Sequence, residues 1–176
     1  MPDVTTIIEN DHREVERLFA VYTGSTPDGK DEVIKQIRLA LAPHSVAEEI
    51  LVYPAVRRAA KEGNEQANHA IDEHQEIKRL LSEVDKMSAG TERDAKLREL
   101  QDAVEQHVQE EEGTLLPRLR ARMDADDLER MGDVFSRIKP LLPTHPHPLV
   151  PGTAAAQLMA GPLASVADRI KDFIGR

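Results

Sequence analysis

An internal repeat limits the folds open to this chain of 176 residues. Residues 11–19 (DHREVERLF) match residues 73–81 (EHQEIKRLL) at an offset of 62, and residues 44–56 match residues 107–119 at an offset of 63. Two segments therefore recur in the same order in both halves of the chain. Such self-similarity indicates one structural unit used twice, here a duplicated helical hairpin.

The repeated segments have the composition and periodicity of α-helices. Ala, Leu, Glu, Arg, Lys and Gln dominate them, and apolar residues recur at steps of three and four. Pro43 should kink or split one helix, because proline removes a backbone hydrogen bond. The sequence predicts an all-α fold, an antiparallel four-helix bundle with short connections. The expected helices span about residues 5–22, 31–61, 65–87 and 91–123.

The last third of the chain has a weaker pattern. We expect a fifth helix, a Pro-rich linker and a short terminal amphipathic helix, over about residues 126–139, 140–152 and 164–173. The prediction is therefore a bundle of residues 1–123 and a C-terminal helical extension of residues 124–176.

Composition removes several classes of function. The chain has no cysteine, which excludes disulfides, thiolate metal sites and thiol catalysis. Its net charge of −9 offers no basic patch for a nucleic-acid backbone. The N-terminus lacks the basic flank and apolar run of a signal peptide, and no stretch of 18 apolar residues occurs. We expect a cytoplasmic monomer or small homo-oligomer with no nucleic-acid or membrane partner.

Four of the seven histidines occupy matched positions in the repeat, and two of them are followed four residues later by glutamate. Residues three, four and seven apart share one face of a helix, and here that face is otherwise apolar. Six polar side chains thus point toward the bundle core. They are His12, His44, Glu48, His74, His107 and Glu111.

Six polar groups in one core need a common partner. An unpaired buried carboxylate is costly, and neutral histidine also needs a partner. The i,i+4 spacing puts imidazole and carboxylate about 6 Å apart at Cβ, close enough to share an ion. We interpret the set as the ligands of a dinuclear metal centre. A salt-bridged or hydrogen-bonded polar core without metal is the alternative interpretation.

The order H…HxxxE…H…HxxxE over residues 12–111 resembles the hemerythrin HHE cation-binding family. The resemblance implies a non-haem di-iron centre with an oxo or hydroxo bridge, held by the six residues above. It also implies small oxidants as partners: hydrogen peroxide, nitric oxide and O₂.

The resemblance further favours an oxidoreductase over a carrier. Oxygen-carrying hemerythrins supply an additional histidine through an HxxxH spacing, and Ala70 stands at that place here. Hemerythrin-like proteins without this histidine are associated with peroxide decomposition and nitric-oxide chemistry, so catalase-like or peroxidase-like activity is expected. A module that senses or stores iron, O₂ or NO, and a reversible O₂ carrier, are the alternatives.

Several other residues are expected not to bind the ions. His69 is rotated about 140° from His74 around the helix, so we place it at the surface. Tyr53 is expected to pack as a core aromatic off the ligand face, with an iron–phenolate bond as the alternative. His145 and His147 lie in the Pro-rich linker, which we expect to be exposed. Nearby carboxylates are predicted to orient the imidazoles (Asp11, Glu14, Glu73, Glu76) or to form a solvated or ligand-supporting face (Glu49, Glu110, Glu112).

Overall fold

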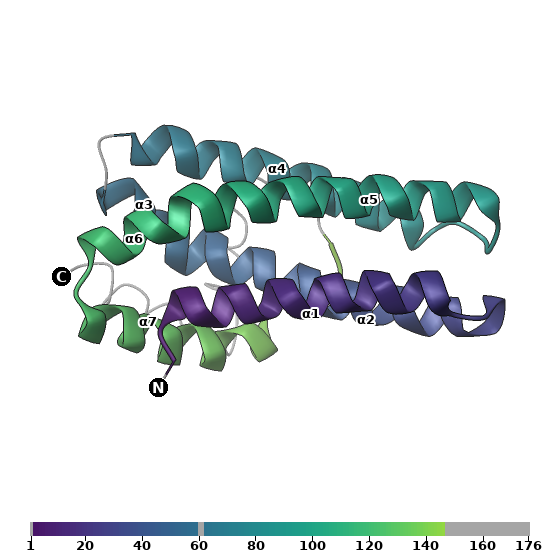
Figure 1. The fold of residues 1–176 in the computed structure, drawn as a ribbon, viewed down its shortest axis with the longest axis horizontal. Coiled ribbons are helices and arrows are strands. Elements are labelled where there is room, and N and C mark those ends of the chain that lie inside the picture. Colours follow the sequence, from purple (N-terminus) through teal and green to yellow (C-terminus); the bar gives the residue numbers. More distant parts are fainter. Residues whose placement is uncertain (1, 60–61, 147–176) are drawn as a thin grey trace.

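A computed structural model describes residues 2–59 and 62–146 (Figure 1). These residues contain helices and no strand, so the predicted all-α class is confirmed. The α-helices are α1 (Val4–Gly24), α2 (Lys30–Ala47), α3 (Tyr53–Ala59), α4 (Gly63–Val84), α5 (Thr91–Glu110), α6 (Leu116–Arg122) and α7 (Ala125–Ile138). Two short 3₁₀ turns accompany them, Pro27–Gly29 and Lys139–Leu141.

The helices pack as a bundle in which α1 lies along α2 and α4 along α5, while α7 packs on α1 (Figure 1). Two apolar clusters fill the bundle. On α1, His12 lies between Ile8 of one cluster and Val15 of the other. On α4, His74 similarly separates Ala70 from Ile77. The predicted ligands therefore form a polar layer between two apolar layers.

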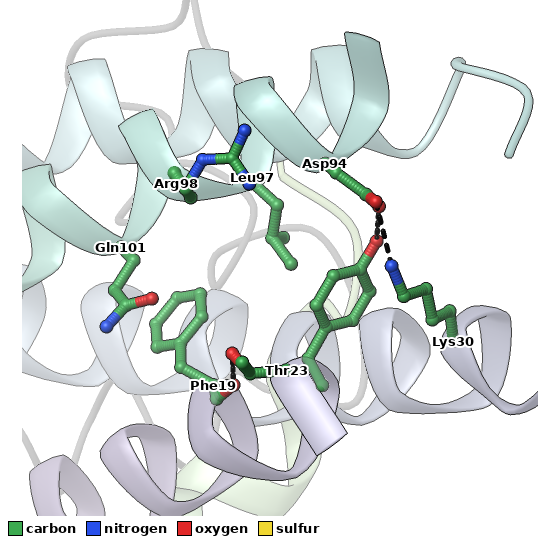
Figure 2. Close-up of a pocket in the computed structure, with 8 residues that line it drawn as sticks. Phe19, Thr23, Lys30, Asp94, Leu97, Arg98 and Gln101 are labelled. Atoms are coloured by element: carbon green, nitrogen blue, oxygen red, sulfur yellow. Dashed lines mark hydrogen bonds and ion pairs between the residues drawn. The ribbon is translucent and has the colours of Figure 1, made fainter. Parts of the chain in front are cut away.

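Near the connection between α1 and α2, one carboxylate joins three helices. Asp94 of α5 accepts hydrogen bonds from the Tyr22 hydroxyl (2.6 Å) and from Lys30 Nζ (2.8 Å) (Figure 2). A pocket of about 260 Å³ opens beside this junction, above Phe19 and Leu97. None of the predicted ligands lines this pocket, so the candidate site is elsewhere.

The helices α2 and α5 each end in a five-residue π-helical turn, Glu48–Val52 and Glu111–Leu115. These turns divide the two longest predicted helices at matched points of the repeat. Pro54 follows the first turn and Pro117 the second. A proline leaves the carbonyl four residues earlier without its usual N–H partner, which favours a wider turn there.

Of the two predicted effects of Pro43, a split of the helix is wrong, because Pro43 lies inside a continuous α2, whereas a kink stays a prediction. The helix tolerates it at the cost of one hydrogen bond, to the carbonyl of Leu39, whose side chain is exposed.

Helix α7 matches the predicted fifth helix and lies close against the N-terminus. A Cβ atom added to Gly132 would be only 2.6 Å from the carbonyl oxygen of Pro2, so this contact requires glycine. Phe135 of α7 is fully buried in the same apolar cluster as Ile8. The predicted helix over residues 164–173 lies outside the described residues. In the described part of the chain, no helix has the length and apolarity needed to span a bilayer.

Candidate metal centre

The structure brings all six predicted ligands together. Their side chains come from four helices and the two π-helical turns, and none of these residues is more than 4% exposed. Their possible ligand atoms form two overlapping groups, within each of which the atoms lie no more than 4.8 Å apart. The groups are His12, His44, Glu48 and Glu111, and Glu48, His74 and His107.

Each glutamate lies between two histidines from different halves of the chain. Glu48 Oε2 is 3.2 Å from His44 Nε2 and 3.4 Å from His74 Nε2. Glu111 Oε2 is likewise 3.4 Å from the Nε2 atom of the α1 histidine and 3.7 Å from that of the α5 histidine. The repeat thus produces two equivalent buried carboxylates, each within 3.7 Å of two imidazole nitrogens.

Most of these atoms have no hydrogen-bond partner. Both carboxylate oxygens of Glu48 and Glu111 are buried and unpartnered, as are the Nε2 atoms of His12 and His44. An unpartnered buried polar group costs about 1–3 kcal/mol, so a whole set converging on one place calls for a compensating group. Metal cations accept such lone pairs, and imidazole nitrogen with carboxylate oxygen suits first-row transition ions. The residues present therefore fit a metal centre.

The second histidine pair supports the same reading. The Nε2 atoms of His74 and His107 face each other at 3.1 Å. The opposite Nδ1 atoms contact carboxylates, Glu49 at 3.1 Å and Glu73 at 2.9 Å. An ionised carboxylate only accepts hydrogen bonds, so Nδ1 donates and Nε2 of the neutral ring presents a lone pair. Two facing lone pairs repel, and a bound cation would relieve that repulsion.

The other two histidines have equivalent supports. Asp11 Oδ2 lies 3.1 Å from Nδ1 of His44, and Glu112 Oε1 lies 2.8 Å from Nδ1 of His12. Each support is adjacent in sequence to a predicted ligand but contacts a histidine of another helix. Carboxylates in this position fix the orientation and tautomer of a metal-binding histidine.

Three of these four supporting carboxylates also hold a permanent cation. The pairs are Lys139 with Asp11 (2.6 Å), Lys78 with Glu49 (2.5 Å) and Arg13 with Glu112 (2.5 Å). Lys139 comes from the turn after α7, so the C-terminal segment contributes to the surroundings of the cluster.

Burial and neighbouring charges oppose each other in the cluster. Burial would lower the pKa of His12, but the carboxylates of Glu111 and Glu112 outweigh it and raise that pKa. Burial would raise the pKa of Glu111, but the neighbouring histidines outweigh it and lower that pKa to about 2.

Burial prevails at His44, His74 and Glu48. It lowers the pKa of His44 to about 4 and, together with the nearby His107, lowers that of His74 well below its usual value. Burial and the adjacent Glu111 raise the pKa of Glu48. Neutral imidazoles are the form that binds metals, whereas two carboxylates side by side resist ionising together. A cation between them would relieve that conflict.

Comparison with known proteins identifies the family. The family model of the hemerythrin HHE cation-binding domain matches residues 3–119. The chain belongs to the hemerythrin HHE cation-binding family. Metal binding, typically of iron, is the common property of these hemerythrin-like domains.

Two relatives were found among curated proteins. An uncharacterized hemerythrin-like protein of Schizosaccharomyces pombe is 30% identical over 177 aligned residues, which cover 99% of this chain and 87% of the yeast protein. A protein of Nostoc sp. named DNA nickase is 32% identical over 139 residues, 78% of this chain but only 39% of the Nostoc protein. No solved structure matches the chain significantly.

Within this hemerythrin-like site, Tyr53 lies closer than its sequence position predicts. Its hydroxyl is 3.1 Å from His74 Nε2, and its side chain is fully buried. Burial raises the pKa of Tyr53, and Glu111 and Glu48 raise it further. The prediction that Tyr53 packs as a core aromatic is confirmed, whereas the expectation that it lies off the ligand face is wrong.

The π-helical turn explains the position of Tyr53. The Tyr53 N–H donates to the carbonyl of Glu48, five residues earlier, so the chain returns to the same face one residue later than in an α-helix. Leu116 occupies the matched position after Glu111 and has no hydroxyl. Pro54 after Glu48 and Pro117 after Glu111 were the sequence features from which these turns could have been predicted.

The remaining predictions about neighbouring residues are partly confirmed. Asp11 and Glu73 contact ligand imidazoles as predicted, whereas Glu14 and Glu76 pair with arginines at the surface. His69 is exposed as predicted, with 57% of its side chain accessible. His145 is also exposed, and His147 lies outside the described residues.

Proposed function

We propose that the buried cluster binds two iron ions joined by an oxo or hydroxo bridge, and that the protein decomposes hydrogen peroxide, with nitric oxide as a further substrate. His12 and His44 would hold one ion and His74 and His107 the other, with Glu48 and Glu111 shared between them. The observation that carries the proposal is the convergence of buried, unpartnered ligand atoms on one place.

A di-iron pair supplies two-electron redox chemistry when bound. Peroxide decomposition is balanced without an external reductant. One peroxide takes up two electrons and two protons and becomes two waters, and a second gives up two electrons and two protons and becomes O₂. The residues of the chain must therefore orient the ions, limit water access and handle protons.

Tyr53 is suited to donate a proton to peroxide on the side of His74 and His107. Its raised pKa keeps the hydroxyl protonated, and its hydrogen bond to His74 Nε2 points the hydroxyl into the cluster. If His74 Nε2 were engaged by a metal, the Tyr53 hydroxyl would be free to donate its proton to an oxidant. Ala70, one turn before His74, is buried and offers no competing ligand.

The test compares the two tyrosines of the chain. Iron-loaded protein should contain about two irons per chain, consume hydrogen peroxide and evolve O₂. Tyr53→Phe should slow turnover by about 100-fold, the usual effect of a general acid, with the iron content unchanged. Tyr22→Phe, at the distant Asp94 junction, is the matched control and should retain the wild-type rate.

Three results would contradict the proposal or the role that it gives to Tyr53. Equal rates in the two tyrosine variants would remove Tyr53 from the reaction. Iron-loaded wild-type protein that leaves peroxide untouched and forms a long-lived, reversible O₂ adduct would favour a carrier. A new visible absorption band lost only in Tyr53→Phe would indicate that Tyr53 binds iron directly.

The broader assignments follow from the same proposal. We propose an antiparallel four-helix bundle of residues 1–123 as the metal-binding unit and residues 124–176 as its extension, in a cytoplasmic monomer or small homo-oligomer. The DNA-nicking activity named for the Nostoc relative is not proposed here, because the match covers 39% of that protein and this chain carries a net charge of −9.

A further inference from the structure

Four carboxylates contact the Nδ1 atoms of the clustered histidines, and Glu73 differs from the other three in its charged partners. Asp11, Glu49 and Glu112 each pair with a lysine or arginine. Among residues 2–59 and 62–146, no lysine or arginine pairs with Glu73, although it supports His107 in the same way. Its neighbours are instead His69 and a second carboxylate, Glu110.

These three side chains converge at the surface between α4 and α5. His69 Nε2 lies 2.9 Å from Glu110 Oε2 and 3.7 Å from Glu73 Oε1. The three ligand atoms are all within 4.8 Å of one another. Atoms bound to one ion at about 2.0–2.2 Å lie roughly 3–4 Å apart, so little movement is needed to enclose a cation.

One of these atoms makes no hydrogen bond. Glu73 Oε1 is buried and makes no hydrogen bond, whereas Glu73 Oε2 accepts from His107 Nδ1. Within the described part of the chain, this cluster of two carboxylates and one exposed imidazole lacks the lysine or arginine that is present at the other three supports.

We propose that His69, Glu73 and Glu110 form a separate surface site for a divalent transition-metal cation. One nitrogen and two carboxylate oxygens suit Zn²⁺ or Fe²⁺, and open positions remain for water. The cation supplies at Glu73 the positive charge that Lys139, Lys78 and Arg13 supply at the other supports.

The first half of the repeat shows why this site exists on one side only. The positions matched to His69 and Glu110 are Ile7 and Ala47. Ala47 belongs to the apolar cluster that also contains residues of α7, and Ile7 packs against that cluster, while Lys139 beyond α7 reaches Asp11. In the second half, His69 and Glu110 are exposed. A soluble cation can therefore reach Glu73, while Asp11 has a cation from the chain itself.

The test counts bound zinc on the full chain by equilibrium dialysis against Zn²⁺. His69→Ala and Glu110→Gln should each bind one zinc fewer than wild type, or bind it at least tenfold more weakly. His145→Ala, which removes another exposed histidine, is the matched control and should bind as wild type does. Glu73 is left intact, because its loss would also disturb His107.

A second measurement locates the ion. Anomalous scattering from crystals soaked in zinc should show a peak bounded by His69, Glu73 and Glu110. Equal zinc counts in wild type and His69→Ala, or no peak there, would overturn the proposal and leave an ordinary surface ion pair. The difference between wild type and variant does not depend on the buried cluster. If the di-iron proposal failed, no metal would be found in the core, but wild type would still bind one zinc more than His69→Ala does.

Discussion

Removing iron from the purified protein is expected to lower its melting temperature by about 10 °C. Six buried atoms of His12, His44, Glu48 and Glu111 have no hydrogen-bond partner without an ion. At about 1–3 kcal/mol for each unpartnered atom, the cost is roughly 6 kcal/mol at the low end. Protonation of a carboxylate and entry of water should offset part of this cost, and we take ~3 kcal/mol as the remainder. A loss of ~3 kcal/mol corresponds to about 10 °C for a chain of this size.

The assay is calorimetric melting of iron-loaded, chelator-treated and reloaded protein at one pH and ionic strength. Reloading should restore the original transition, which separates loss of iron from irreversible damage. His69→Ala, outside the buried cluster, should show the same difference between the iron-loaded and chelator-treated forms. If the iron-loaded and chelator-treated proteins melt within about 2 °C of each other, the buried atoms are satisfied without metal and the polar-core alternative is correct.

Two further predictions concern single side chains. His74→Ala should lower the iron content measured by metal analysis, because it removes a proposed ligand, whereas His69→Ala should keep both core irons; equal losses would refute the assignment of the α4 face. Asp11→Ala should weaken iron affinity about 10–100-fold in competition with a chelator, since carboxylates that orient ligand histidines have effects of this size. Glu14→Ala is the control, because Glu14 pairs with Arg17 at the surface, and an equal loss in this variant would show that general charge matters and orientation does not.

The sequence predicted that these six side chains lie together in the core, because the relevant geometry is local. Four-residue spacing places His44 and Glu48 on one helical face, and the repeat does the same for His107 and Glu111. The prediction failed for Tyr53 because it assumed an unbroken α-helix beyond Glu48. In the π-helical turn, five residues return to the face that four residues reach in an α-helix.

The supports of the histidines were harder to predict because they cross between helices. Asp11 and Glu14 both flank His12 on α1, yet only Asp11 reaches an imidazole, that of His44 on α2. The difference depends on how the helices pack, which spacing within one helix does not fix. The contact between Lys139 and Asp11 was harder still to predict, because 128 positions of sequence separate the two residues.

The departures from the repeat make the two proposed ion positions unequal. A perfect repeat would surround both ions identically, with two histidines each and two shared glutamates. Tyr53 breaks this equality, because it follows Glu48 of the first half but contacts His74 of the second. The matched residue, Leu116, brings no proton to the other side. An oxidant bound near His74 would therefore meet the Tyr53 hydroxyl, which has no counterpart at Leu116 on the other side. We therefore propose that the proton-dependent step of the proposed reaction takes place on the side of His74 and His107.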